Sequence, residues 1–411
     1  MIPALRFSKF KSEYLPKIID EIAKVTSGGT PSRAKADYWN GHIPWVTTSQ
    51  INFKDITAAD EYITDLGLKK SSAKLFPKGT ILLALYGQGI TRGRVSVLEI
   101  EATTNQACAA IILESEDVNT RFTFYYLQSK YEDIRNLAND GGQKNLSGGL
   151  VKSLSVVLPS DVMEQAEVAD FLTSVDNKIS QLIEKHCLLK DYKKGVMQQI
   201  FSQQIRFKDD DGNTFPEWNT HELAMLSESG ISNGVFNDPK KVGKGFRLIN
   251  VKDMYKGDSI EYSELTLLDL EPKLFEKNKV KYGDIFFTRS SIVPTGIAFS
   301  NVNLSEKEDI TFDGHLMKIS PNKKLVDPLF LAYYLRSYAP RKALVSRGKQ
   351  STMTTIAQDD IKDIKLNIPA LKEQQKIAQF LQSLDKKINA VNEQIEQTKL
   401  FKKGLLQQMF V

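Results

Sequence analysis

Short loops that mix hydroxyl, amide and basic side chains with aromatic rings are the parts of this chain best suited to chemistry with another molecule. The first half carries five such loops, at residues 30–35, 45–50, 86–94, 105–106 and 141–147. Arg and Lys pair with phosphates or with guanine, whereas Asn and Gln pair with adenine. The loops therefore predict contacts with nucleic acid, and an ordinary turn is the alternative at each position.

The candidate DNA contacts are spread over both halves of the sequence. In the first half they are Thr30, Ser32, Arg33, Lys35, Thr47, Thr48, Ser49, Tyr86, Gln88, Arg92, Arg94, Gln143, Lys144 and Asn145. In the second half they are Arg247, Asn250, Lys252, Arg289, Ser290, His315, Arg347, Lys349 and Gln350. The net charge of +5 is mild and is compatible with a nucleic-acid partner without requiring one.

Sequence signatures of catalysis are missing. The chain contains no Gly-x-Ser-x-Gly elbow, no His-Glu-x-x-His pair and no Asn/Asp-Pro-Pro-Tyr/Phe box of the kind that grips a flipped base. The glycine-rich segment 87–93 completes no nucleotide-binding pattern and predicts a strand connection. Two cysteines and four scattered histidines show no metal-ligand spacing. Binding is therefore the predicted role, without a metal or cofactor in this chain.

A long internal repeat organises the sequence. Residues 164–201 align without a gap with residues 373–410, at a constant offset of 209, and 17 of these 38 positions are identical. Apolar residues in each copy recur at alternating steps of three and four, which is the pattern of a coiled-coil seam. Each copy predicts a helix of roughly 57 Å, too long to be covered by one small domain. Each helix is therefore expected to bury its seam against the other.

Chain connectivity sets the direction of this helix pair. The first helix carries the chain from the first domain to the second, where the second helix must begin, so an antiparallel pair follows. The two halves are then related by a pseudo-twofold axis, and Phe410 is expected near Arg6. The expected parts are a first domain at 1–159, a central helix at 160–203, a second domain at 204–368 and a C-terminal helix at 369–411.

The variable parts of the chain predict an α+β class. Apolar runs at 80–85 and 107–113 predict strands, and residues 120–130 and 327–338 predict short helices that start at a Thr or Asp cap. The length of 411 residues fits two globular domains. The predicted fold is thus two globular α+β domains separated by two long antiparallel coiled-coil helices.

Hydropathy indicates the compartment. The sequence has no uninterrupted apolar span of membrane length, and its first residues lack the apolar run of a secretory signal. No membrane partner is expected, and we expect the protein in the cytoplasm.

The end of each repeated helix carries the motif Lys-Lys-Gly-x-x-Gln-Gln. Solvated charge is the default interpretation of such a motif, but its recurrence in both copies favours a shared docking surface. The candidate docking residues are Lys193, Lys194, Gln198, Gln199, Lys402, Lys403, Gln407 and Gln408.

These motifs together resemble one protein family over essentially the full length of the chain. They are the segment Gly-Gly-Thr-Pro-Ser-Arg at 28–33, Tyr38-Trp39, the run Ile-Pro-Trp-Val at 43–46, Asn-Gln-Ala at 105–107, and the twin helix endings. In this combination the chain resembles the specificity subunit of type I restriction-modification systems. The second domain departs from the opening motif and has Ser-Gly-Ile-Ser-Asn-Gly at 229–234.

The resemblance implies two target-recognition domains that each read one half of a split double-stranded DNA site, with the helices as a ruler for the unread gap. It implies two methyltransferase subunits, which carry S-adenosylmethionine, and endonuclease/translocase subunits, which use ATP and Mg, as partners of a non-catalytic chain. The alternatives are a free-standing DNA-modifying enzyme and a coiled-coil scaffold that binds no DNA. Deleting a few residues within 180–190 is expected to change the gap but not the half-sites.

Overall fold

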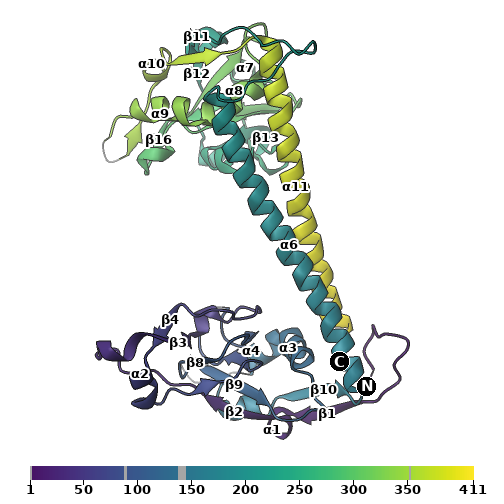
Figure 1. The fold of residues 1–411 in the computed structure, drawn as a ribbon. Helices are drawn as coiled ribbons and strands as arrows, with labels where there is room; N and C mark the ends of the chain where they lie inside the picture. Colours follow the sequence, from purple (N-terminus) through teal and green to yellow (C-terminus); the bar gives the residue numbers. More distant parts are fainter. Residues whose placement is uncertain (1, 88–89, 138–144, 351–352) are drawn as a thin grey trace. The chain divides into compact units, whose positions relative to one another are not determined.

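The computed structural model describes residues 2–87, 90–137, 145–350 and 353–411. Its contacts divide the chain into two compact units (Figure 1). Unit 1 comprises Met1–Ile183 and Glu393–Val411, and unit 2 comprises Glu184–Asn392. Two long helices, α6 (Val162–Phe201) and α11 (Leu371–Gln408), each contribute residues to both units.

Unit 1 combines short strands with short helices. Its strands are β1 (Tyr14–Ile18), β2 (Ala23–Ser27), β3 (Trp39–Val46), β4 (Glu61–Ile63), β5 (Leu75–Phe76), β6 (Ile81–Ala84), β7 (Val95–Val97), β8 (Ala102–Thr104), β9 (Cys108–Leu113) and β10 (Ser155–Pro159). Its short helices are α1 (Ile19–Ile22), α2 (Asp65–Lys69), α3 (Thr120–Ser129), α4 (Tyr131–Asn136) and α5 (Gly148–Lys152). The strands form two four-stranded sheets, of order β2-β9-β6-β7 and β4-β3-β8-β5, and a β1-β10 pair.

Unit 2 is also built from short strands and short helices. Its strands are β11 (Asn219–Glu222), β12 (Ser227–Asn233), β13 (Val242–Ile249), β14 (Thr266–Leu268), β15 (Ile285–Thr288), β16 (Ser290–Ser291), β17 (Ser300–Val302), β18 (Ile310–Phe312), β19 (Leu316–Pro321), β20 (Thr354–Thr355) and β21 (Lys365–Ile368). Its short helices are α7 (Pro272–Lys277), α8 (Pro328–Arg336), α9 (Tyr338–Ser346) and α10 (Gln358–Ile361). The sheets have the order β12-β19-β15-β17 and β14-β13-β18, with β11-β21 and β16-β20 pairs.

The two units share one topology despite their different sequences. The sheet β12-β19-β15-β17 repeats the connections of β2-β9-β6-β7, and the parallel pair β13-β18 repeats the parallel pair β3-β8. The α+β class and the internal repeat are therefore confirmed.

The predicted short elements are found at their expected places. Strands β6 and β9 fall within the two apolar runs, and helices α3 and α8 within the two predicted helical segments. Helix α8 has the predicted cap, because Asp327 accepts a hydrogen bond from Phe330 N (2.8 Å). The cap of α3 is Asn119 rather than Thr120, since the Asn119 amide oxygen accepts from Phe122 N (3.0 Å). An Asn one residue earlier satisfies the free amide group equally well.

The two long helices pair in opposite directions. In unit 1, Val168 near the start of α6 shares a core with Leu405 near the end of α11. In unit 2, Ile200 at the end of α6 shares a core with Ile377 near the start of α11. The start of one helix therefore packs against the end of the other in each unit, so the predicted antiparallel pair is confirmed (Figure 1).

The two chain ends lie together in unit 1. Leu5 N donates a hydrogen bond to Gln408 O (2.8 Å), and Figure 1 marks both termini beside the same end of the helices. Phe410 packs on Phe122, with 5.2 Å between ring centroids. The expected proximity of the N-terminal segment and the end of α11 is confirmed. No helix in the described part of the chain is long and apolar enough to cross a membrane.

Candidate nucleic-acid interface

The carboxyl ends of four strands meet at one edge of unit 1. Strands β3 and β8 pair in parallel up to their last residues. Strands β2 and β6 both pair antiparallel with β9 and end beside its first residues. The loops that follow these four strands therefore lie together. We call this surface edge 1 and define it by residues 28–35, 47–50, 85–94 and 105–107, excluding the undescribed positions 88–89.

Backbone hydrogen bonds join the loops of edge 1 into one surface. They run from Gly29 N to Thr104 O (2.8 Å), from Asn105 N to Val46 O (3.1 Å), from Leu85 N to Ala107 O (2.8 Å) and from Leu146 N to Leu85 O (3.0 Å). The last of these bonds brings Asn145 to the same edge. Loops that were separate candidates in the sequence are thus neighbours in the fold.

Several side chains of edge 1 hold one another in place. The Arg33 guanidinium lies 3.7 Å from the ring centroid of Trp39 and pairs with the Glu61 carboxylate (2.9 Å). The hydrogen bond from Arg33 outweighs burial and holds the pKa of Glu61 below its usual range. Thr30 Oγ1 donates to Gln106 Oε1 (2.6 Å). Edge 1 therefore presents an oriented cation beside hydroxyl and amide groups, which is the chemistry of a nucleic-acid surface.

The remaining candidates of the first half lie on or near edge 1. Thr47 and Ser49 share a hydrogen bond (2.6 Å), and Lys35 Nζ donates to Tyr38 OH (3.1 Å). The Arg94 guanidinium lies over the Phe53 ring at 5.7 Å. Ser32, Thr48, Tyr86, Arg92 and Asn145 occupy the same loops or the adjoining segment. Gln88, Gln143 and Lys144 lie outside the described residues.

Unit 2 builds the same edge from different residues. The ends of β12, β13, β15 and β18 meet as their counterparts do in unit 1. We call this surface edge 2 and define it by residues 234–237, 250–252, 289–293 and 313–315. Its cross-loop bonds run from Val235 N to Phe312 O (2.9 Å), Asp313 N to Ile249 O (3.0 Å), Arg289 N to His315 O (3.0 Å) and Ile356 N to Arg289 O (3.0 Å).

A glycine at the same structural position explains how the divergent opening segment keeps the same backbone. A Cβ atom on Gly28 would lie 2.1 Å from Thr104 O, and a Cβ atom on Gly234 would lie 2.1 Å from Phe312 O. Only glycine permits so close an approach of the two backbones. Ser-Gly-Ile-Ser-Asn-Gly therefore differs from the motif of the first half in sequence, while Gly234 takes the place of Gly28.

Two candidates of the second half use their polar groups within the fold. Arg247 lies within β13, two residues before the end of the strand, and its Nη1 donates to Leu265 O (3.0 Å). Asn250 Nδ2 donates to Thr266 Oγ1 (2.8 Å). A sequence pattern marks polarity but does not reveal such internal partners, so the sequence alone predicts both residues as surface groups.

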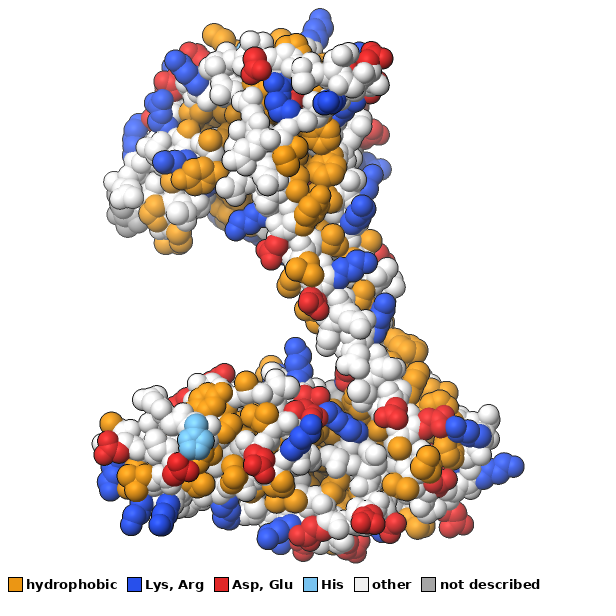
Figure 2. Space-filling model, in the orientation of Figure 1, with side chains coloured by type: hydrophobic (Ala, Val, Ile, Leu, Met, Phe, Trp, Pro, Cys, Tyr) orange, Lys and Arg blue, Asp and Glu red, His pale blue; other side chains and the backbone are white. Residues whose placement is uncertain are grey.

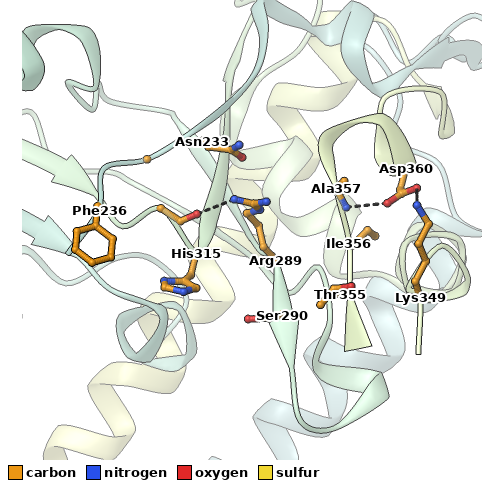
Figure 3. A pocket seen from close by; sticks show the side chains of 12 residues that line it. Asn233, Phe236, Arg289, Ser290, His315, Lys349, Thr355, Ile356, Ala357 and Asp360 are labelled. Atoms are coloured by element: carbon orange, nitrogen blue, oxygen red, sulfur yellow. Dashed lines mark hydrogen bonds and ion pairs between the residues drawn. The ribbon is translucent and has the colours of Figure 1, made fainter. Parts of the chain in front are cut away.

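Other candidates surround a cavity of about 690 Å³ at edge 2. Figure 3 shows Arg289 between Asn233 and His315, with Phe236 on one side and Lys349 on the other. Lys349 pairs with Asp360 (2.7 Å). The other residues of this lining are Gly234, Ser290, Gly314, Thr355, Ile356 and Ala357. Lys252 and Gln350 are exposed, and Arg347 pairs with Asp363 (3.4 Å).

A duplicated set of polar contacts between an Asp, a Tyr and a Lys was missed by the sequence reasoning. In unit 1, Asp176 of α6 accepts from Tyr125 OH (2.9 Å) and from Lys402 Nζ of α11 (2.7 Å). In unit 2, Asp385 of α11 accepts from Tyr333 OH (2.5 Å) and from Lys193 of α6. Identical Asp and Lys residues at repeat positions were the available signal. Each cluster ties one recognition unit to both helices.

A second duplicated contact fixes the start of each long helix. Arg6 Nε donates to Glu164 (2.6 Å) in unit 1, and Arg206 Nη2 donates to Glu373 (2.9 Å) in unit 2. Both carboxylates are fully buried. In the sequence, Ala-Leu-Arg-Phe at 4–7 corresponds to Gln-Ile-Arg-Phe at 204–207, and in the structure the two arginines form one ion pair built twice.

The candidate docking residues divide into two groups. Lys193 and Lys402 turn inward to the aspartates described above, and their side chains are 14% and 10% exposed. Lys194, Gln198, Gln199, Lys403, Gln407 and Gln408 are exposed. A Cβ atom added to the intervening Gly195 or Gly404 would have no described atom within 4 Å beyond its own helix backbone. The outward part of the motif is therefore an open surface on each helix.

Charge is mixed on the surface. On the face drawn in Figure 2, Lys and Arg side chains alternate with Asp and Glu side chains on both units. Among the described residues, no group of three or more His, Cys, Asp or Glu side chains is placed to hold a metal ion.

Two units of one topology, each with a loop-built edge and a share of an antiparallel helix pair, define a duplicated recognition protein. The family model of the type I restriction modification DNA specificity domain matches residues 11–186 and 217–399. The chain therefore belongs to this family, and the resemblance found in the sequence is confirmed. DNA target recognition within type I restriction-modification is the function of that class.

Individual relatives agree with the family assignment. The type I restriction enzyme MjaIX specificity subunit of Methanocaldococcus jannaschii is 26% identical over 97% of this chain and 93% of its own length. The EcoBI specificity subunit of Escherichia coli is 23% identical over 72% of this chain and 65% of its own length. The fold matches the crystal structure of an S subunit from M. genitalium with a TM-score of 0.58 and 16% identity, covering 100% of this chain and 99% of the other.

Proposed function

We propose that this chain reads one bipartite, asymmetric site on double-stranded DNA, with edge 1 on one half-site and edge 2 on the other. The observation that carries the proposal is that one backbone edge is built twice, from strands of the same topology, with different side chains. Equal geometry favours equal roles, and different side chains favour different base sequences. The recognised site is therefore interrupted and non-palindromic.

The side chains of the edges supply two kinds of contact. Exposed basic residues such as Lys252, and Arg33 beside its aromatic support, suit phosphates and guanine edges. Hydroxyl groups such as that of Thr48 in edge 1, and the amide of Gln350 next to Lys349 of the edge 2 cavity, add hydrogen bonds to bases or sugars. Because phosphate contacts release counterions, binding is expected to weaken steeply as salt rises.

The paired helices are proposed to set the gap between the half-sites. Helix α6 is continuous for 40 residues and α11 for 38 residues. At 1.5 Å per residue, each helix spans roughly 60 Å, which is a little less than two turns of duplex DNA at roughly 34–36 Å per turn. A change in helix length is therefore proposed to change the gap without altering either edge.

The repeated helix endings are proposed to dock two methyltransferase subunits. Six exposed Lys and Gln side chains flank Gly195 and Gly404 on two equivalent surfaces. A glycine inside a helix destabilises it by roughly 0.5–1 kcal/mol relative to alanine, and neither glycine is required by a neighbour within the described chain. The absence of a Cβ atom at Gly195 and Gly404 would allow a partner to approach the helix backbone closely, which explains why glycine occupies both positions.

The proposed complex is completed by endonuclease/translocase subunits and acts on DNA in the cytoplasm. S-adenosylmethionine, ATP and Mg belong to these partners, and the chain described here contributes recognition only. Methylation requires a flipped adenine, so the partner approaches while the two edges hold the duplex.

A binding selection tests the proposal directly. The chain assembled with its cognate methyltransferase is incubated with duplexes of random sequence, and retained DNA is sequenced. One interrupted motif is expected, and Arg33→Gln is expected to relax one half of it only. A scaffold would retain no specific sequence. A free-standing enzyme would transfer methyl groups or cleave DNA as the purified chain alone.

A further inference from the structure

The turn at residues 313–315 holds an exposed histidine on an unusually constrained backbone. Gly314 N donates to Val235 O (2.7 Å), and Leu316 N donates to Asp313 O (2.9 Å). Arg289 adds two bonds, from its backbone N to His315 O (3.0 Å) and from Nη1 to Gly314 O (2.9 Å). The turn is thus tied to two other parts of edge 2, at Val235 and Arg289, and Figure 3 shows the Arg289 contact beside the His315 ring.

The imidazole ring itself is oriented by a buried carboxylate. Asp313 Oδ1 accepts from His315 N (2.7 Å) and lies 2.7 Å from His315 Nδ1. The Asp313 side chain is 6% exposed, whereas that of His315 is 68% exposed. A carboxylate only accepts hydrogen bonds, so the proton of the neutral ring is on Nδ1 and the lone pair is on Nε2. His315 therefore presents a hydrogen-bond acceptor in a fixed direction.

The equivalent turn of unit 1 has the same backbone but lacks this group. Ala107 N donates to Asn105 Oδ1 (3.2 Å), as His315 N donates to Asp313 Oδ1. Ala107 stands where unit 2 has His315, so the histidine is not needed to form the turn. A side chain that the fold does not require, placed on a rigid support and left exposed, fits a recognition role.

We propose that His315 is a specificity-determining residue of the second half-site, whose Nε2 accepts a hydrogen bond from one exocyclic amino group of a base. Two bases offer such a donor in the major groove, cytosine at N4 and adenine at N6. The inference rests on the proposed function and adds a named atom and a named class of base group. Guanine and thymine lack this donor and are disfavoured at the position that His315 reads.

The test compares the wild-type complex with His315→Ala, a substitution that copies Ala107 of the equivalent turn. Each protein is assembled with the cognate methyltransferase and incubated with duplexes that are randomised in both half-sites. The bound duplexes are then recovered and sequenced. The wild type is expected to require cytosine or adenine at one position, and His315→Ala is expected to lose that preference by about tenfold. The first half-site, the gap and the other positions are expected to remain unchanged.

A base analogue then tests whether the contacted group is the amino group of the selected cytosine or adenine. The cytosine is replaced by 2-pyrimidinone, or the adenine by purine, which removes only the amino group. The affinity of the wild-type complex is expected to be about tenfold lower for the duplex with the analogue than for the cognate duplex. The His315→Ala complex is expected to bind these two duplexes with the same affinity. Equal penalties for the two proteins, or an unchanged motif in His315→Ala, overturn the proposal.

A measurement on the wild-type chain tests the proposal even if the His315→Ala variant does not fold. In the full chain labelled with ¹⁵N-histidine, the neutral His315 ring is expected to carry its proton on Nδ1, and Nε2 is expected to shift on cognate DNA but not on the analogue. A proton on Nε2, or no selective shift, contradicts the proposal. If the wild-type complex selects no second half-site at all, the proposed function itself fails, and this inference fails with it.

Discussion

Single buried residues carry a pH dependence that can be measured. The Glu164 carboxylate accepts from Arg6 Nε (2.6 Å) and Tyr14 OH (3.1 Å) and also contacts Ser12. Burial acts to raise the pKa of Glu164, but the hydrogen bonds from these three side chains outweigh it and hold the pKa below the ordinary value of 4.5. The stabilisation is therefore complete above about pH 4.5 and is lost as pH falls through the lower pKa of the folded state.

Glu164→Gln isolates this contribution. At neutral pH the substitution is expected to lower the free energy of unfolding by about 1–3 kcal/mol, because charge-assisted hydrogen bonds to Arg6 are lost. Urea denaturation at neutral and acidic pH should show the difference from wild type shrinking on acidification. Glu167→Gln, which removes the more exposed pair with Lys9, serves as the control and should change little at either pH. A constant difference for Glu164→Gln would contradict the assignment.

The close-approach glycines carry a second residue-scale prediction. Gly28→Ala and Gly234→Ala each force a Cβ atom toward a carbonyl oxygen at 2.1 Å, so the loops at the affected edge must shift. Each substitution is expected to destabilise its unit by about 1–3 kcal/mol. Thermal unfolding of each variant is the measurement. Gly148→Ala, with no described atom within 4 Å of the new Cβ, is the matched control and is expected to unfold like the wild type.

At the scale of elements, a buried cluster joins both helices to helix α8 in unit 2. Asp385 on α11 accepts from Lys193 on α6 and from Tyr333 on α8. Burial raises the pKa of Asp385, and the hydrogen bonds from Lys193 and Tyr333 oppose that rise. The cluster thus uses a desolvated carboxylate to hold three elements in one register.

Replacing only Asp385 should destabilise the protein more than replacing both Asp385 and Lys193. Asp385→Leu removes the buried carboxylate beside Lys193 and leaves its ammonium with only the half-exposed carboxylate of Asp258 (3.5 Å). The substitution is expected to cost about 3 kcal/mol of stability. Asp385→Leu combined with Lys193→Met is expected to recover most of the loss, because no uncompensated charge remains. Chemical denaturation of the two single variants and the double variant gives the coupling directly. Additive losses would show that the pair is not coupled.

Substitutions of Gly195 and Gly404 are expected to have opposite effects on the stability of the isolated chain and on its assembly with the methyltransferase. Gly195→Ala and Gly404→Ala add a methyl group to open space and remove a poor helix former, so each is expected to stabilise the isolated chain by roughly 0.5–1 kcal/mol. Under the docking proposal the same changes weaken assembly with the methyltransferase. Thermal unfolding and a titration with methyltransferase measure the two effects. Stabilisation without any loss of assembly would remove the argument for docking at these glycines.

At the scale of the whole molecule, periodic and repeated features were accessible from the sequence. The seam residues Ile377 and Leu381 are buried as their spacing predicted, because a 3.5-residue period is a local property of the chain. The repeat predicted two equivalent units, and the mixed polar loops were predicted one by one as candidate contacts, without their gathering at two edges. Both follow from patterns that need no knowledge of distant partners.

Features that depend on distant partners were not accessible. Lys193 and Lys402 were predicted to be surface residues. Their partners, Asp385 and Asp176, lie 192 and 226 residues away in the sequence, so local patterns do not reveal them. Arg247 was predicted as a DNA contact, and nothing in the sequence indicates that its guanidinium also donates to Leu265 O on another segment of the chain. The orientation of His315 likewise depends on a buried carboxylate whose burial only the fold reveals. Polarity is visible in a sequence, whereas the direction of a side chain is not.

Helix length is the property that links the whole molecule to its DNA site. Removing one heptad from each helix, Gln181 to Cys187 and Val391 to Gln397, keeps the seam in phase and shortens each rod by roughly 10 Å. Neither deletion touches edge 1, edge 2 or the two Asp–Lys–Tyr clusters. The two half-sites should therefore be read as before.

The most direct measurement is methylome sequencing after co-expression with the cognate methyltransferase, for the wild type and for the paired heptad deletion. We predict one interrupted adenine-methylated motif for the wild type, and the same two half-sites with a shorter gap for the deletion. An unchanged gap, or methylation of a single uninterrupted sequence, would contradict two reading units spaced by an antiparallel helix pair.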